Sequence, residues 1–198
     1  MTDTAAPGLT PPPGLTLPAA LAEAHRCLMC WDAPCIRACP TAIDIPGFIK
    51  RIAQRNDTGA ARVILAANLL GDSCAHACPT SVLCEGACVM NDVDARPVAI
   101  GRLQAFATQP IVQGGIQLFT PAAPTGKRVA IVGGGPAGLA CAGELARRGH
   151  EAVVFDAGAE PGGLNTAGIA EYKQSRNAAL AEIEWLSGLG FTILHNSA

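Results

Sequence analysis

Two groups of closely spaced cysteines constrain this 198-residue chain more than any other feature of its sequence. The first group consists of Cys27, Cys30, Cys35 and Cys39. The second consists of Cys74, Cys78, Cys84 and Cys88. A Cys-Pro step occurs in each group, and so many thiols at short spacing are typical of metal sites that shape the fold around them. We therefore predict a metal-binding protein that handles electrons.

The cellular compartment expected for this chain favours metal binding over disulfide bonding. The N-terminal sequence lacks the basic and apolar regions of a signal peptide, and no apolar run approaches the roughly 20 residues of a membrane span. We therefore expect a cytoplasmic protein, and a reducing cytosol disfavours disulfides. A net charge of −2 gives no reason to expect nucleic acid or a membrane as a partner.

The apolar spacing predicts an α-helical domain followed by part of a Rossmann-like, doubly wound α/β domain. The cysteine groups make the first an expected iron–sulfur domain, and two glycine loops make the second an expected FAD-binding domain. Residues 1–18 suggest a flexible arm, 19–108 the helical domain, 109–126 an extended linker and 127–198 the α/β part. Within the helical domain, we expect one helix to end at Gly71 and a short one over Val98–Phe106. Metal ligation would stabilise so thin a helical core.

A glycine loop lies in a strand–loop–helix–strand context in the C-terminal part. We predict strands over 128–132, 152–155 and 191–194, a helix from the loop to Arg148, and another from Tyr172 to Leu189. Gly133 permits a tight turn, Gly135 lets the backbone approach a pyrophosphate, and Gly138 lets helix and strand pack closely.

Two further features bear on which dinucleotide this loop binds. Asp156, at the end of the second strand, is placed to accept hydrogen bonds from the adenosine ribose. The segment Pro161-Gly162-Gly163-Leu164 then provides a second loop of close approach, which is more typical of FAD proteins than of simple NAD dehydrogenases.

The spacing of the cysteines favours iron–sulfur clusters and leaves zinc as an alternative. Zinc sites usually pair Cys-x-x-Cys units, and Cys27/Cys30 is the one such pair. Ferredoxin sequences have closely spaced cysteines followed by Cys-Pro, and eight thiols suit two four-iron clusters. We interpret His76 as a surface or packing residue and Cys141 as a small core residue.

Several segments resemble dihydropyrimidine dehydrogenase, and more closely the NAD(P)H-oxidising subunit of the bacterial enzyme, which is similar to the glutamate synthase small subunit. They include E-A-H-R-C-L-M-C-W-D-A-P-C, L-C-E-G-A-C-V and P-G-G-L-N-T-A-G-I-A-E-Y-K, and the resemblance runs from about Ala22 to the last residue.

The resemblance implies ligands for two [4Fe-4S] clusters. One cluster would be held by Cys27, Cys30, Cys35 and Cys88. The other would be held by Cys39, Cys78, Cys84 and Gln104, which leaves Cys74 as a bystander. Glutamate synthase small subunits tend to carry Glu near position 104, so Gln104 favours the dihydropyrimidine dehydrogenase branch. A neutral amide in place of a thiolate also raises the potential of a cluster, other things being equal.

The resemblance also implies the residues that contact FAD. They are Gly133, Gly135, Pro136, Ala137, Gly138, Asp156, Gly163, Leu164 and Lys173. The family commonly has Arg where Lys173 stands, and Lys lacks the bidentate geometry of Arg. The backbone near Ala77 is expected to approach the flavin from the helical domain.

The activity implied is electron transfer from NAD(P)H through FAD and both clusters to an FMN/iron–sulfur partner subunit that reduces uracil or thymine. The cofactors carry this chemistry, so no catalytic side chain is predicted. The family's NAD(P)H domain is not in these 198 residues; we therefore expect a truncated chain that is inactive alone. Two alternatives are a glutamate synthase small subunit and a non-catalytic metal-binding docking module.

Overall fold

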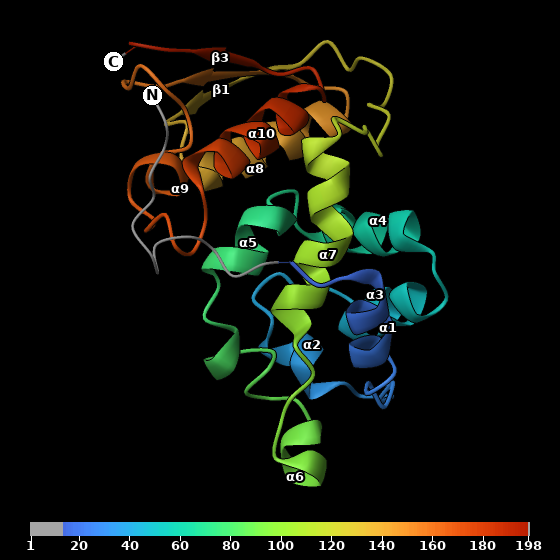
Figure 1. Ribbon diagram of the computed structural model, residues 1–198. Helices are drawn as coiled ribbons and strands as arrows, with labels where there is room; N and C mark the ends of the chain where they lie inside the picture. Colours follow the sequence, from blue (N-terminus) through green and yellow to red (C-terminus); the bar gives the residue numbers. More distant parts are fainter. Residues whose placement is uncertain (1–13, 198) are drawn as a thin grey trace. The chain divides into compact units, whose positions relative to one another are not determined.

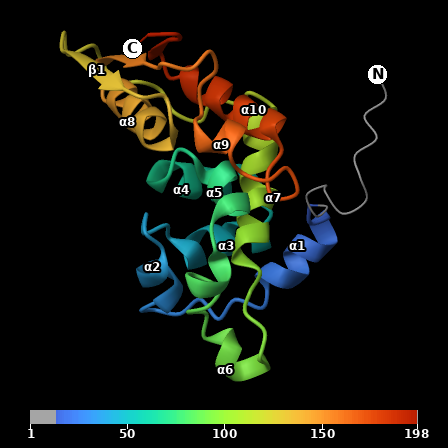
Figure 2. The same ribbon diagram turned by 90° about the vertical axis from the view of Figure 1, so that its left-hand side faces the viewer.

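The computed structural model describes residues 14–197, which divide into two compact units (Figures 1 and 2). The helical unit comprises described residues 14–111, and the sheet unit comprises 112–197. Residues 1–13 of the predicted arm lie outside the described part, and the first helix already begins at Leu17. Each helix in the described part is too short or too polar to cross a membrane.

The helical unit consists of short helices joined by loops. Its elements are α1 (Leu17–Ala24), α2 (Pro34–Ala38), α3 (Ile45–Ala53), α4 (Asp57–Ala67), α5 (Gly71–Ala77), the 3-10 turn η1 (Thr80–Val82), α6 (Met90–Asp94) and α7 (Ile100–Gln113). Side-chain oxygens of Thr16, Asp44 and Asn56 accept backbone N–H groups at the starts of α1, α3 and α4. Such caps satisfy N–H groups that have no partner within the helix.

The core of the helical unit lies where α3 packs against α1 and α4 (Figure 1). Phe48, Ile49 and Ile52 of α3 are at most 1% exposed, as are Ile64 and Leu65 of α4. The cysteines lie mainly in the shorter elements and loops outside this three-helix core. Regular packing thus supports one part of the unit, and the thiols lie where the backbone is less regular.

Gly71 does not end a helix, contrary to the sequence prediction. Helix α4 ends at Ala67, and Gly71 is the first residue of α5. A Cβ atom at position 71 would lie 2.7 Å from Cγ2 of Ile64, so a side chain there has no room. The glycine allows close packing between α5 and α4. In the sequence, a glycine with this role looks the same as one that ends a helix.

Helix α7 is longer than predicted and includes the first five residues of the expected linker. Leu103, Ala107 and Ile111, spaced four residues apart, are all buried, so one face of the helix stays in the core beyond Phe106. Pro110 lies inside the helix without ending it.

The sheet unit contains three parallel strands in the order β1-β2-β3. Its elements are β1 (Arg128–Val132), α8 (Pro136–Arg147), β2 (Glu151–Phe155), α9 (Leu164–Ala167), α10 (Arg176–Ser187) and β3 (Thr192–Leu194). The three predicted strands are confirmed to within one residue at each end. Helix α10 begins later than predicted because Ser175 caps it by accepting the N–H of Ala178, 3.1 Å away.

The rest of the expected linker is bound to the sheet unit. The indole N–H of Trp185 donates to the carbonyl of Ile116 over 2.8 Å, and the Arg147 guanidinium lies 4.2 Å from the ring centre of Phe119. The N–H of Thr125 donates to the carbonyl of Gly149 over 2.9 Å. These contacts attach the segment to α8 and α10, although its sequence lacks helical or strand periodicity.

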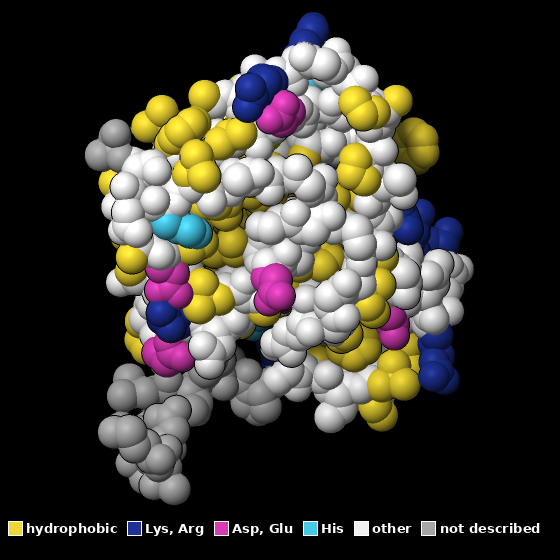
Figure 3. Space-filling view, turned by 90° about the horizontal axis from the view of Figure 1, so that it is seen from above, with side chains coloured by type: hydrophobic (Ala, Val, Ile, Leu, Met, Phe, Trp, Pro, Cys, Tyr) yellow, Lys and Arg dark blue, Asp and Glu magenta, His cyan; other side chains and the backbone are white. Residues whose placement is uncertain are grey.

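One face of the sheet is covered and the other is exposed. Helices α8 and α10 lie on the same side of the strands (Figure 1). On the other side Val132, Phe155 and Leu194 are paired in register and are 92%, 37% and 41% exposed. Hydrophobic side chains gather on the surface seen in Figure 3. Parallel sheets are usually covered on both faces, so this face is an unusual surface.

Candidate metal centres and glycine loop

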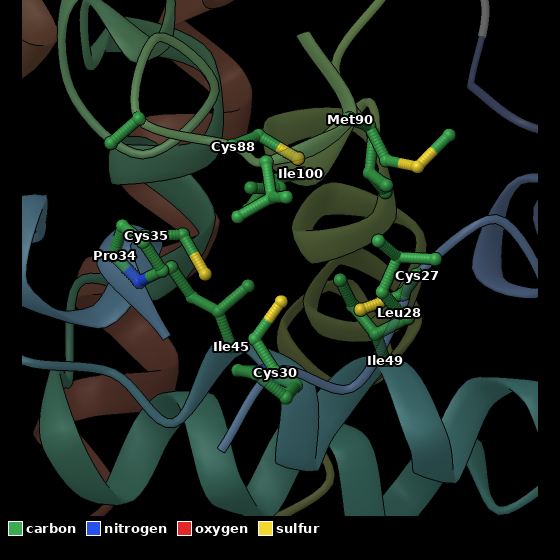
Figure 4. A pocket seen from close by; sticks show the side chains of 14 residues that line it. Cys27, Leu28, Cys30, Pro34, Cys35, Ile45, Ile49, Cys88, Met90 and Ile100 are labelled. Carbon is green, nitrogen blue, oxygen red and sulfur yellow. The ribbon is translucent and has the colours of Figure 1, made fainter. Parts of the chain in front are cut away.

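Four thiols from three separate segments of the helical unit surround one hollow. Cys27 and Cys30 come from the loop after α1, Cys35 from α2, and Cys88 from the loop before α6. Their sulfur atoms point toward the space between them (Figure 4). The remaining walls are apolar and include Ile45, Ile49, Val98 and Ile100. The structure thus brings together the four cysteines that the resemblance assigned to one cluster.

The surroundings of this hollow disfavour negative charge in the absence of metal. Burial, with smaller effects from the neighbouring Cys27 and Cys88, raises the pKa of Cys35 to about 11. Burial also raises the pKa of Cys27. Thiols bind iron as thiolates, so a positively charged group must displace their protons. Facing thiols in an apolar pocket therefore suit a group that carries several positive charges.

The space between the thiols bears on the kind of metal group that they suit. Within residues 14–197, no three Cys, His, Asp or Glu side chains converge closely enough to hold a single metal ion. A zinc ion draws its four sulfurs to within about 2.3 Å of one centre. A four-iron cluster instead binds its four cysteines at separate corners. Thiols arranged around a hollow fit the larger group.

A second set of thiols lies elsewhere in the helical unit. Cys39 follows α2, Cys78 follows α5, and Cys84 is buried after η1. Burial raises the pKa of Cys84 to about 12, and the charges of Glu85, Cys78 and Cys39 add to it. Burial also raises the pKa of Cys78, with an added effect of Cys39. Because such effects weaken with distance, Cys39 and Cys78 lie within electrostatic range of Cys84.

Gln104, the predicted fourth ligand of this set, is held against the start of α5. Its side chain is buried on α7, and its Nε2 donates to the carbonyl of Gly71 over 2.7 Å. That bond fixes the amide and leaves Oε1 as the atom for another partner. Since α5 leads directly into Cys78, the bond joins Gln104 to the segment that carries a predicted ligand.

Two other residues of α5 occupy defined positions. The Cys74 side chain is hydrogen-bonded to Cys78, so the predicted bystander lies beside the second thiol set. His76 lies near the buried Asp72, whose Oδ1 accepts the hydroxyl of Thr108 over 2.8 Å. Burial raises the pKa of Asp72. Cys141, which we predicted in the core, is instead exposed on α8, because the buried face of that helix passes through Leu139, Ala142 and Ala146.

Arg26 holds the first thiol set in place, a role for which the sequence carries no signal. Its guanidinium donates to the carbonyls of Arg96 and Pro97, over 2.6 and 2.9 Å, and forms ion pairs with Glu23 and Asp94. Cys27 follows Arg26 directly, so this network fixes the start of the cysteine loop against the segment that leads into α7.

The glycine loop has the backbone that its predicted role requires. Gly133 has a φ of +95°, and a Cβ atom on Gly138 would lie 2.0 Å from the carbonyl oxygen of Gly133. A Cβ atom on Gly135 would meet nothing within 4 Å, which leaves open space in front of the N-terminus of α8. Free N–H groups and the helix dipole at such a terminus attract phosphate.

Asp156 and the second glycine loop lie against the first loop. The Asp156 carboxylate accepts the N–H of Gly134 and, over 2.7 Å, that of Gly158. The N–H of Gly162 donates to the carbonyl of Gly134 over 2.7 Å, and a Cβ atom on Gly163 would lie 3.2 Å from the Cα of Gly135. Two stretches that are separate in sequence, residues 133–135 and 156–163, thus meet at the carboxyl ends of β1 and β2, where doubly wound sheets bind ligands.

The other predicted flavin contacts have less defined surroundings. Pro136 and Ala137 form the first turn of α8, and Leu164, which begins α9, is 73% exposed. Lys173 is exposed in the turns before α10. Ala77 ends α5 in the helical unit, and the approach of its backbone to a flavin stays a prediction.

Comparison with known proteins agrees with both halves of this description. Residues 12–116 match the family described as dihydropyrimidine dehydrogenase domain II, 4Fe-4S cluster. The chain belongs to that family. The matched region contains all eight predicted cluster ligands. Residues 131–171 match an NAD(P)-binding Rossmann-like domain, a region that includes the glycine loop and Asp156.

Relatives within the dihydropyrimidine dehydrogenases match nearly the whole chain. It is 41% identical over 185 residues to the NAD-dependent dihydropyrimidine dehydrogenase subunit PreT of Escherichia coli K12, covering 93% of this chain and 45% of that protein. It is 39% identical over 184 residues to PreT of Salmonella typhimurium, covering 93% and 44%. The chain thus spans less than half the length of these curated relatives. These matches confirm the resemblance drawn from the sequence.

Proposed function

We propose that this chain is the electron-transfer part of an iron–sulfur flavoprotein oxidoreductase of the dihydropyrimidine dehydrogenase type. The observation that carries the proposal is the hollow in which Cys27, Cys30, Cys35 and Cys88 face one another. The donor set, the apolar walls and the distribution of the thiols over three segments fit a four-iron cluster. The grouping of Cys39, Cys78 and Cys84, with Gln104 attached to α5, supports a second one.

The protein's part in this function is to hold and insulate the cofactors. When bound, a flavin would exchange pairs of electrons with NAD(P)H and the clusters would pass on single electrons. The thiols would bind the clusters as thiolates, and Ile45, Ile49 and Ile100 would exclude water from the first site. Apolar surroundings and hydrogen bonds to the ligands set the potential of each cluster.

The sheet unit would hold the adenosine diphosphate part of FAD. Backbone N–H groups at the start of α8 would bind the pyrophosphate, in the open space in front of Gly135, while Gly163 lets the second loop lie close to Gly135. The Asp156 carboxylate, which now accepts the N–H groups of Gly134 and Gly158, would accept the ribose hydroxyls. FAD is proposed over NAD because of the second glycine loop, whereas the family match is to NAD(P)-binding domains in general.

For the whole protein we propose NAD(P)H as electron donor and an FMN/iron–sulfur subunit that reduces uracil or thymine as partner. The similar PreT proteins are named subunits of an NAD-dependent dihydropyrimidine dehydrogenase, which supports this branch over a glutamate synthase small subunit.

Anaerobic reconstitution with iron, sulfide and FAD tests the cofactor assignment. We expect a brown protein that holds about eight irons per chain, as two four-iron clusters require. Iron and acid-labile sulfide analysis measures this, and electron paramagnetic resonance of the reduced protein should show two interacting clusters. A colourless protein that binds zinc and no iron would overturn the proposal and support the docking-module alternative.

A further inference from the structure

Glu85 links the two segments that carry the most unusual pair of predicted ligands. It follows Cys84 directly, and its Oε1 accepts the backbone N–H of Gly101 over 2.9 Å. Gly101 lies in the first turn of α7, and Gln104 follows three residues later on the same helix. One side chain therefore fastens the loop of Cys84 to the helix of Gln104.

The backbone around Glu85 is fixed on both sides, so its side chain has a stable base. Its N–H donates to the carbonyl of Thr80 over 2.9 Å. Its carbonyl accepts the Nδ2 of Asn91, also over 2.9 Å. The residue is half-buried, and these two bonds hold its backbone in place.

The carboxylate also acts electrically on the second thiol set. Glu85 follows Cys84 directly and its carboxylate is held at the first turn of the helix that carries Gln104, so its charge is fixed close to two predicted ligands. A fixed negative charge thus stands beside the one predicted cluster whose ligands include a neutral amide.

We propose that Glu85 is a positioning residue of the second cluster, which rests on the proposed function of this chain. It keeps the Cys84 loop and α7 together, so that Gln104 stays within reach of the metal. Gln104 is neutral, whereas a cysteine ligand would carry a negative charge. The negative charge of Glu85, which is not itself a ligand, compensates for part of that difference. It therefore lowers the reduction potential of that cluster, because a nearby negative charge disfavours adding an electron.

The decisive variant is Glu85→Gln in the reconstituted full chain. The amide oxygen can still accept the N–H of Gly101, so the iron content should stay at the wild-type value. We expect one of the two clusters to be reduced more easily, with an equilibrium constant roughly threefold higher or more, equivalent to about 28 mV at about 59 mV per tenfold for one electron. Potentiometric titration followed by electron paramagnetic resonance measures this shift.

Three further variants separate charge from position. Glu85→Asp keeps the charge, so its potential should stay closer to the wild type than that of Glu85→Gln. Glu85→Ala removes both charge and acceptor, and we expect it to lose up to half of the iron. Asp92→Asn removes one charge from exposed residue 92 of α6 in the same unit and should leave both potentials unchanged.

The outcomes distinguish this inference from the proposed function. A wild-type chain that binds no iron–sulfur cluster would overturn both. A wild-type chain with two clusters would retain the proposed function; if Glu85→Gln then matches it in iron content and in both potentials, the role of Glu85 alone is wrong. That role is also wrong if Asp92→Asn shifts a potential as much as Glu85→Gln does.

Discussion

The two units of the molecule bury their apolar residues in opposite ways. In the helical unit Phe48 is completely buried between neighbouring helices. In the sheet unit Val132, Phe155 and Leu194 form an exposed row on one face of the sheet. The helical unit closes its own core, although it is thin and relies on ligands from separate loops. The sheet unit has a covered face and an exposed face, so its parallel strands gain stability from one side only.

The largest effect is expected from removing a thiol of the first hollow. Cys88→Ser should remove one cluster, about half of the bound iron, because three thiols and a poor oxygen ligand remain. The loop of Cys88 would then lose its link to the segments of Cys27 and Cys35, so the helical unit should also unfold at a lower temperature. Iron analysis and thermal unfolding followed by circular dichroism measure the two effects.

Cys74→Ser is the matched control, since it removes a thiol that lies beside Cys78 but is not a predicted ligand. It should keep about eight irons. If Cys74→Ser lost as much iron as Cys88→Ser, the ligand set of the second cluster would have to include Cys74, and the bystander assignment would be wrong.

A smaller effect is expected from the core of the helical unit. Phe48→Ala should lower the free energy of unfolding by about 3–5 kcal/mol, as large-to-small changes in a closed core do. Phe155→Ala, on the exposed face of the sheet, should cost clearly less, since fully burying such a side chain contributes about 1.5–3 kcal/mol and this one is partly exposed. Denaturant unfolding of both variants makes the comparison, and equal losses would contradict it.

The sequence was sufficient for features that depend on local patterns. The runs 128–132 and 152–155 are strands as predicted, and the glycine loop has the predicted backbone, because both depend on neighbouring residues. Predictions from local patterns were wrong where packing between residues distant in the sequence determines the structure. Gly71 resembled a helix end but makes room for Ile64, and Cys141 is exposed although its helix is partly buried.

The candidate site shows the same division between local and distant information. Spacing alone suggested two separate groups of four cysteines. The pairing of Cys88 with the first group came from the family resemblance, and the structure places it in that hollow. Spacing cannot show this because loops of any sequence length can bring distant residues together. The roles of Arg26 and Glu85 could not be read from spacing, since single charged residues beside cysteines are common and these two reach backbone groups more than ten residues away.

The smallest effect on the free energy of unfolding is expected on the exposed face of the sheet. The same change, Val to Thr, is made once on each face for comparison. Val132→Thr replaces a methyl group by a hydroxyl on a side chain that is 92% exposed, so the free energy of unfolding should change by less than about 0.5 kcal/mol. Val154→Thr makes the same change on the neighbouring strand at a side chain that is completely buried. It should cost about 1–3 kcal/mol, because the hydroxyl loses its contact with water.

Measured in the same chain, this pair tests whether the two faces differ in solution. If Val132→Thr lowered the free energy of unfolding as much as Val154→Thr does, something would have to cover the open face. If that decrease depended on protein concentration, the cover would be a second copy of the chain. Independence of concentration together with the small expected change would leave the face open to water. The contrast between a closed helical unit and a half-covered sheet would then hold in solution.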